Sequence, residues 1–199
     1  MDTIKQFKYK KIKNFLTPSE SNIFKDYCRI RHRLNRDSFD TLQSSTLDTA
    51  IYADPLMESL LINKNSQMEK LTGLSLKPTY SFWKMYTKFA DLESHTDRPS
   101  CEISVTITLG SDGTSWPIFM DGKPLDLHPG DAVIYLGCDL PHWREEFKGD
   151  WQAQTFLHYV DAKGPFADHW KDKRLLWGEA YCGPTINPVH GVPIKTDKE

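Results

Sequence analysis

Residues 101–109 read CEISVTITL, a stretch in which apolar and polar side chains alternate. Successive side chains of an extended strand point to opposite faces. One face would therefore carry only apolar side chains, and the glutamate, serine and threonines would take the other. The pattern predicts a strand with one apolar and one polar face. The apolar set is Ile103, Val105, Ile107 and Leu109.

Similar runs, rich in aromatic and β-branched residues, continue on both sides of this segment. Turn sequences such as GSDG (110–113) and HPGD (128–131) separate them. Many short antiparallel strands are typical of a sandwich or a barrel. We therefore expect a mostly β core at 78–161. The predicted strands lie near 79–89, 101–109, 116–120, 132–136, 142–146 and 152–160.

Two helices are expected before this core. Thr17-Pro18-Ser19-Glu20 forms a capping box, with proline at the first helical position. Asp54-Pro55 starts a second helix, and Gly73 is a suitable terminator. Both helices would pack on one sheet as a buttress, and the segment IKQFKYKKI (4–12) predicts a strand ahead of them. The apolar stripes at helical spacing are Ile23, Tyr27, Ile30 and Leu34 in the first helix, and Leu56, Leu60, Leu61, Met68 and Leu71 in the second.

With 199 residues, 39% of them hydrophobic, the chain is long enough for a single domain with its own core. We expect one domain over 1–199, with a helical buttress (1–77), a β core (78–161) and a C-terminal extension (162–199). The run PFADHWKDKRLLW in that extension is a candidate helix.

Composition also bears on partners and compartment. The net charge is −2 and no long basic run occurs, so no nucleic-acid partner is expected. No apolar run approaches the length that spans a bilayer, and the N-terminus lacks a secretory signal pattern. The cysteines are scattered without a CxxC pair, which favours reduced thiols in a cytoplasmic protein. They are Cys28, Cys101, Cys138 and Cys182.

The motif that carries chemistry is His95-Thr96-Asp97, with His142 much later in the chain. Residues at positions i and i+2 of a strand share a face, and a ligand from another strand can complete a three-ligand set. Two imidazoles and one carboxylate hold Fe(II) and leave three coordination positions open, as oxygen activation requires. A closed, cysteine-rich site could not do this.

Four segments around this motif resemble the iron- and 2-oxoglutarate-dependent dioxygenases, and among them the prolyl-hydroxylase-like branch. The resemblance implies a double-stranded β-helix (a jelly-roll or cupin-like barrel) flanked by helices, an α+β arrangement. It also implies that His95, Asp97 and His142 are the iron ligands. The segments are YTKFADLESHTD (86–97), PGDAVIY (129–135), His142 and FLHYVD (156–161).

The resemblance further implies the activity. Such an enzyme uses Fe(II), 2-oxoglutarate and O2, with ascorbate as an optional reductant, and releases succinate and CO2 while it hydroxylates a C–H bond. The substrate stays open between a peptidyl residue and a small molecule, because this scaffold serves many substrates.

One departure from the family pattern concerns 2-oxoglutarate. Gln152 occupies the position where a basic residue usually binds the distal carboxylate, and glutamine offers only neutral hydrogen bonds. Arg144 shares the face of His142 and is the predicted replacement. The alternatives are a surface ion pair of Arg144 with a nearby acidic residue, and Lys88 or Arg98 as the anchor.

Tyr80 and Tyr86 share a strand face and are candidates for binding the cosubstrate together with Gln152, although core packing would equally suit them. His158 and Arg98 are candidates for the substrate pocket. For His158 a buried structural role is an equal alternative, and for Arg98 a salt bridge within its loop is the main one.

Two other functions compete with the oxygenase. A cupin-like metal-binding barrel, acting as an isomerase or a binding protein without 2-oxoglutarate, would explain Gln152. A non-catalytic scaffold is the third, and the intact triad argues against it.

Overall fold

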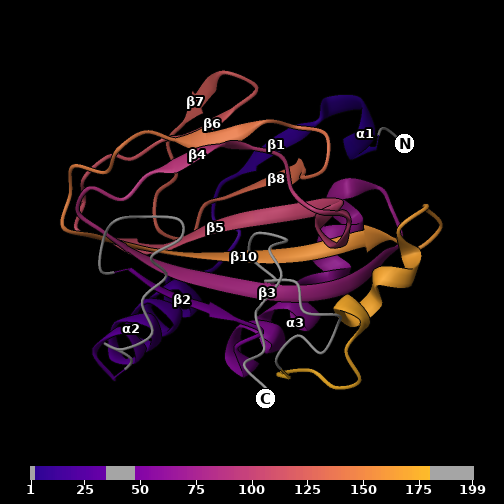
Figure 1. Cartoon of the computed structure of the whole chain (residues 1–199), viewed down its shortest axis with the longest axis horizontal. Coiled ribbons are helices and arrows are strands. Elements are labelled where there is room, and N and C mark those ends of the chain that lie inside the picture. The colour runs from indigo at the N-terminus through magenta and orange to yellow at the C-terminus, as the bar shows by residue number, and fades with distance from the viewer. Residues whose placement is uncertain (1–2, 35–47, 180–199) are drawn as a thin grey trace, which may run out of the picture.

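The computed structural model describes residues 3–34 and 48–179. Two antiparallel sheets face each other in it and form an open barrel (Figure 1). The major sheet has the order β1-β8-β5-β10-β3-β2, with β1 (Tyr9–Ile12), β8 (Ala132–Leu136), β5 (Ile103–Ser111), β10 (Trp151–Asp161), β3 (Leu76–Thr87) and β2 (Thr49–Tyr52). The minor sheet has the order β4-β9-β6-β7, with β4 (Leu92–His95), β9 (His142–Arg144), β6 (Ile118–Met120) and β7 (Lys123–Leu125).

This architecture confirms the mostly β fold with flanking helices. Each of the six strands predicted in the β core is present, with ends that differ by a few residues. The strand predictions did not include β2, β4 and β7. β7 consists of three residues with a central proline, which suits only the edge of a sheet, so it gives almost no strand signal.

The strands of the major sheet divide their two faces as CEISVTITL predicts. The apolar side chains of β5 join the main core cluster, where Trp83 and Leu157 from β3 and β10 also lie. The other face is polar and lines the barrel. There Thr106 donates to Gln154, which in turn donates to Thr108 at 2.9 Å. Buried polar groups in hydrogen-bonded sets of this kind leave the barrel interior suited to a polar ligand.

Helices α2 (Pro18–Leu34) and α3 (Pro55–Thr72) lie beside the major sheet on the side away from the minor sheet (Figure 1). Both predicted N-termini are confirmed. The Thr17 amide donates to Glu20 Oε2 at 2.7 Å and the Glu20 amide returns a bond to Thr17 Oγ1, while the Asp54 carboxylate accepts from the amides of Leu56 and Met57. Gly73, at φ 71°, ends α3 as predicted. No helix in the described ranges is both long and apolar enough to cross a membrane.

The predicted buried face of α2 is wrong except at Tyr27, which is partly buried and packs against the core cluster. Ile23 and Ile30 are 61% and 59% exposed, whereas Phe24 and Cys28 point into the core. The reason lies in a contact that the apolar pattern does not show. Ser21 donates to the Leu109 carbonyl of β5 at 2.9 Å, and this small polar residue allows the helix to approach the sheet along a neighbouring stripe. Leu34 also faces solvent.

The two ends of the chain differ in detail from the sequence analysis. Residues 4–12 form a short helix, α1 (Ile4–Phe7), and β1, where one strand was expected. Residues 1–77 are therefore not a purely helical buttress, since β1 and β2 extend the major sheet. The candidate C-terminal helix is a kinked 3-10 segment, η2 (Ala167–Lys173). Residues 35–47 and 180–199, which include Cys182, lie outside the described residues. Cys28, Cys101 and Cys138 are free thiols.

The rotated face of α2 leads to a prediction with its own control. Phe24→Ala should lower the free energy of unfolding by about 3–5 kcal/mol, because it removes a buried aromatic ring. Ile23→Ala, one residue away, should change it by less than about 0.5 kcal/mol, because that side chain is solvated. Urea denaturation of the two variants measures both values. A larger loss for Ile23→Ala would mean that the helix packs as the sequence pattern alone suggests.

Candidate active site

Three predicted metal ligands meet at one end of the barrel. His95 ends β4 and His142 begins β9, and the antiparallel pairing of these strands places the two residues directly opposite each other. Asp97 follows two residues after β4, and its Oδ1 lies 3.7 Å from His95 Nε2 and 3.6 Å from His142 Nε2. The structure therefore brings together all three side chains that the motif predicts.

The orientation of both imidazoles suits a metal. His95 Nδ1 lies 2.8 Å from the Glu93 carbonyl and His142 Nδ1 lies 2.9 Å from the Leu140 carbonyl. A carbonyl accepts only from N–H, so each ring carries its proton on Nδ1 and keeps a lone pair on Nε2, toward Asp97. Burial lowers the pKa of His142, which favours the neutral form that binds metal.

Asp97 is held by groups that the sequence analysis did not single out. Its amide donates to the Gly137 carbonyl at 2.8 Å, and its Oδ2 lies 3.2 Å from Ser104 Oγ. A Cβ at position 137 would lie 2.2 Å from the Cys101 carbonyl oxygen and 2.5 Å from Asp97 Oδ2. Only glycine can occupy position 137, because a side chain there would collide with both groups. The sequence feature that could have indicated this contact is a glycine directly after strand β8.

Arg144 is the most unusual charged group in the barrel. It lies two residues after His142, is 3% exposed, and stacks on Trp116, whose carbonyl accepts from Nη1. Its Nη2 is fully buried without a hydrogen-bond partner, and no carboxylate pairs with it among residues 3–34 and 48–179. Burial lowers the pKa of Arg144 to about 10. The surface ion pair considered from the sequence is therefore wrong.

The other basic residues near the barrel have different surroundings. Lys88, the weaker alternative anchor, is exposed. Lys84, which the sequence analysis missed, is fully buried on β3, but its Nζ lies 3.3 Å from the equally buried Asp48 carboxylate. Its charge is thus compensated within the protein, unlike that of Arg144.

The tyrosines predicted on β3 separate into two environments. Tyr86 is buried and packs edge-on against Trp116, next to Arg144, and its strand partner is the buried Gln152. Tyr80 lies further along the strand, with its ring 4.5 Å from that of His158. Only Tyr86 therefore lies beside the unpaired guanidinium.

A further tyrosine, Tyr135 on β8, was missed. Its ring lies 4.7 Å from that of His142, and burial raises the pKa of its hydroxyl, which therefore keeps its proton as a neutral polar group in the barrel. The sequence could have indicated that Tyr135 faces the barrel interior, because Tyr135 and Val133 are two positions apart on β8 and therefore share a face of the strand.

The two substrate-pocket candidates are both near the metal ligands. His158 is buried, and its Nδ1 lies 2.8 Å from Ser104 Oγ, which also reaches Asp97. Arg98 follows Asp97 directly, and its guanidinium pairs with both oxygens of Asp172 from η2, at 2.7 and 2.5 Å. Arg98 thus forms a salt bridge, as the alternative considered, but its partner lies in η2 and not within its own loop.

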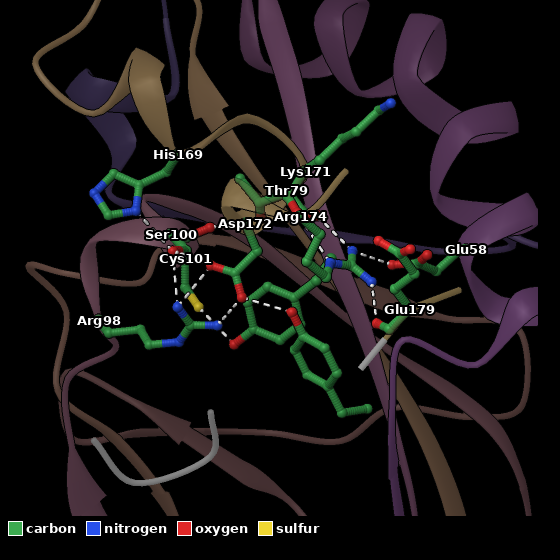
Figure 2. Close-up of polar contacts among 12 residues, drawn as sticks. Glu58, Thr79, Arg98, Ser100, Cys101, His169, Lys171, Asp172, Arg174 and Glu179 are labelled. Carbon is green, nitrogen blue, oxygen red and sulfur yellow. Dashed lines mark hydrogen bonds and ion pairs between the residues drawn. The ribbon is translucent and has the colours of Figure 1, made fainter. Parts of the chain in front are cut away.

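Figure 2 shows the network around this pair. The Asp172 carboxylate also accepts from Tyr52 and from Ser100, each at 2.6 Å. A second buried ion pair joins Arg174 to Glu58 of α3 at 2.5 Å. The segment after the barrel is thereby fixed to β2, to α3 and to the loop that carries Asp97.

Comparison with known proteins bears on the fold. No family model and no curated protein matches the sequence. Among solved structures, a prolyl-4-hydroxylase from Pseudomonas putida matches with a TM-score of 0.63 and 18% identity, over 79% of this chain and 95% of that one. The α-ketoglutarate-dependent epimerase SnoN from nogalamycin biosynthesis matches with a TM-score of 0.67 and 12% identity, over 98% of this chain and 93% of that one.

A third similar structure is a prolyl hydroxylase from Trichoplax adhaerens in complex with a hypoxia-inducible-factor peptide fragment. Its TM-score is 0.58 at 15% identity, over 80% of this chain and 86% of that one. At sequence identities this low, the similarity shows only that the fold is shared. It confirms the double-stranded β-helix of the 2-oxoglutarate oxygenases, including prolyl hydroxylases, that the sequence resemblance implies.

The Arg98–Asp172 pair predicts a pH-dependent stability. Burial alone would raise the pKa of Asp172, but its bonds to Arg98, Ser100 and Tyr52 outweigh this and hold the pKa below its usual value. A lowered carboxyl pKa stabilises the fold above the unfolded value, near 4, and this contribution is lost as pH falls through the folded value. Asp172→Asn should therefore cost about 3 kcal/mol at pH 7, and the difference from the parent should shrink below about pH 4.

Denaturant unfolding at several pH values measures this difference. Glu146→Gln is the control, because it removes the carboxylate of the exposed pair with Lys148 and should change stability by less than about 1 kcal/mol. A loss for Asp172→Asn that does not vary with pH would contradict an electrostatic origin.

Proposed function

We propose that this protein is a non-haem Fe(II)- and 2-oxoglutarate-dependent oxygenase that hydroxylates a C–H bond. The observation that supports this most directly is the unpaired, buried Arg144 guanidinium two residues from a His/Asp/His triad. A buried charge without a partner is costly, so its presence favours a ligand that brings a carboxylate.

His95, Asp97 and His142 would hold the iron through two Nε2 atoms and one carboxylate oxygen. Three protein ligands leave coordination positions for the cosubstrate and for O2. The His95 and Asp97 side chains are 38% and 14% exposed, so this side of the triad can be reached from solvent. When bound, iron and 2-oxoglutarate supply the oxidative chemistry, with succinate and CO2 as products.

Arg144 would bind the distal carboxylate of 2-oxoglutarate. A guanidinium presents two parallel N–H groups to a carboxylate, and such charge-assisted bonds are about twice as strong as neutral ones. Nη1 is fixed by the Trp116 carbonyl, while Nη2 retains its hydrogen-bonding capacity for the ligand. Tyr86 and Gln152 lie opposite each other on neighbouring strands and would complete this end of the site. Tyr80 belongs with His158 and Arg98 on the substrate side.

The substrate proposed is a peptidyl residue or a small molecule. Oxygenases of similar fold include one in complex with a peptide and others named as an epimerase and a carbocyclase. Hydroxylation is the reaction we propose among these outcomes. A cupin-like barrel that does not use 2-oxoglutarate would leave the charge of Arg144 unexplained.

The decisive experiment is turnover of the cosubstrate. Purified protein with Fe(II), 2-oxoglutarate, ascorbate and O2 should release succinate, even without substrate at a low uncoupled rate, and Asp97→Ala should abolish it. Asp26→Ala, which makes the same change on the exposed side of α2, is the matched control and should retain turnover. Tight iron binding by the parent without any succinate, in the presence of candidate peptides and metabolites, would instead favour the cupin-like alternative.

Arg144→Gln tests the proposed anchor. The variant should bind 2-oxoglutarate about 100-fold more weakly, a loss of about 3 kcal/mol for two charge-assisted bonds. Without cosubstrate it should be as stable as the parent or more stable, because an uncompensated buried charge is removed. Thermal unfolding with Mn(II), with and without 2-oxoglutarate, measures both effects.

Two further variants delimit this result. Lys148→Gln removes an exposed cation and should leave both quantities unchanged. Arg144→Lys keeps the charge without the two parallel N–H groups and should fall between parent and glutamine variant. Equal 2-oxoglutarate affinity in Arg144→Gln and the parent would exclude Arg144 as the anchor.

A further inference from the structure

A second group of metal-binding side chains lies beside the triad. An oxygen of Asp97, Sγ of Cys101 and a ring nitrogen of His158 all lie within 4.8 Å of one another. Asp97 belongs to both groups. Its Oδ1 faces the two triad imidazoles, while its Oδ2 is on the side of Ser104, whose hydroxyl also contacts His158. One carboxylate thus presents a different oxygen to each side.

We propose that Asp97, Cys101 and His158 form a second metal site, which takes a thiophilic divalent cation such as Zn²⁺ and shares the Asp97 carboxylate with the triad. The three side chains alone define it, so it does not depend on the use of 2-oxoglutarate.

The donor atoms distinguish this site from the triad. One sulfur, one nitrogen and one oxygen are the ligands that tetrahedral Zn²⁺ accepts, with a fourth position left for water. The triad offers no sulfur, so it lacks preference for a thiophilic ion. For mixed sites of this kind, zinc also binds more tightly than ferrous iron in the usual order of divalent metals.

Burial and the Asp97 carboxylate raise the pKa of Cys101, so its sulfur is a thiol in the metal-free protein. Once a bound cation has displaced that proton, two neighbouring groups stabilise the thiolate. The Tyr80 hydroxyl lies 3.0 Å from Sγ and can donate to it, and the Arg98 guanidinium lies 4.5 Å from the Tyr80 ring centroid. A hydrogen-bond donor and a cation both stabilise negative sulfur.

His158 is prepared as a ligand in a different way. It is 5% exposed, and burial lowers the pKa of its imidazole to about 4, so the ring is neutral near pH 7. It therefore has no additional proton to lose on binding a cation. Cys101 alone must lose one: the S–H bond breaks, a sulfur–zinc bond forms, and the proton passes to solvent.

Cobalt substitution tests the site, because a thiolate bound to Co(II) gives an intense sulfur-to-metal absorption in the near ultraviolet, which nitrogen and oxygen ligands do not. Metal-free protein titrated anaerobically with CoCl2 should develop this band. His95→Ala, which breaks the triad and leaves the second group intact, should keep it. Cys101→Ser should lose it, and added Zn²⁺ should remove it from the parent.

Cys138→Ser is the matched control, since that thiol lies in the same region but outside the group. A band that persists in Cys101→Ser, or its absence from the parent, would overturn the proposal. Should the Cys101 variant fail to fold, X-ray absorption of zinc-loaded His95→Ala decides. A sulfur neighbour near 2.3 Å supports the site, and only nitrogen and oxygen neighbours near 2.0–2.2 Å refute it. None of these measurements depends on succinate formation. A protein that forms no succinate can therefore still pass or fail this test of the second metal site.

Discussion

The antiparallel pairing of β4 with β9 is the constraint on which the site depends. It places His95 opposite His142, and Leu92 opposite Arg144, so one short ladder sets both the metal end and the cation below it. A slip of one residue would turn both groups away from the barrel, because side chains alternate along a strand. The Gly137 contact and the Ser104 bond then hold Asp97 against this ladder.

The site also depends on the major sheet, whose two faces differ in polarity. Its outer face is apolar and is covered by α2 and α3, while its inner face is polar and carries threonines that bond to Gln154. Burial of the outer face provides the stability that a polar barrel interior cannot provide. In the part of the chain that the structure describes, no carboxylate pairs with Arg144, and this missing counter-ion is what points to an anionic ligand.

Much of this arrangement could be predicted from local sequence patterns. Period-two alternation located the predicted strands, the capping residues located both long helices, and the HxD motif with a distant histidine located the triad. What failed depended on contacts between distant segments. The orientation of α2 is set by Ser21 against β5. The partner of Arg98 lies 74 positions away, in a segment that was expected to be a helix and forms a kinked 3-10 segment. Lys84 and Asp48 likewise gave no local sign that they would meet inside the barrel.

The buried pair between Arg174 and Glu58 has a consequence for where this chain can be shortened. Arg174 is 4% exposed and also donates to the Thr79 carbonyl of β3, so the backbone near it is part of the packed structure. Ending the polypeptide before this arginine would leave the carboxylate of Glu58 enclosed without a counter-ion. The residues from the end of β10 to Arg174 are therefore part of the packed structure, and a shortened version must keep them.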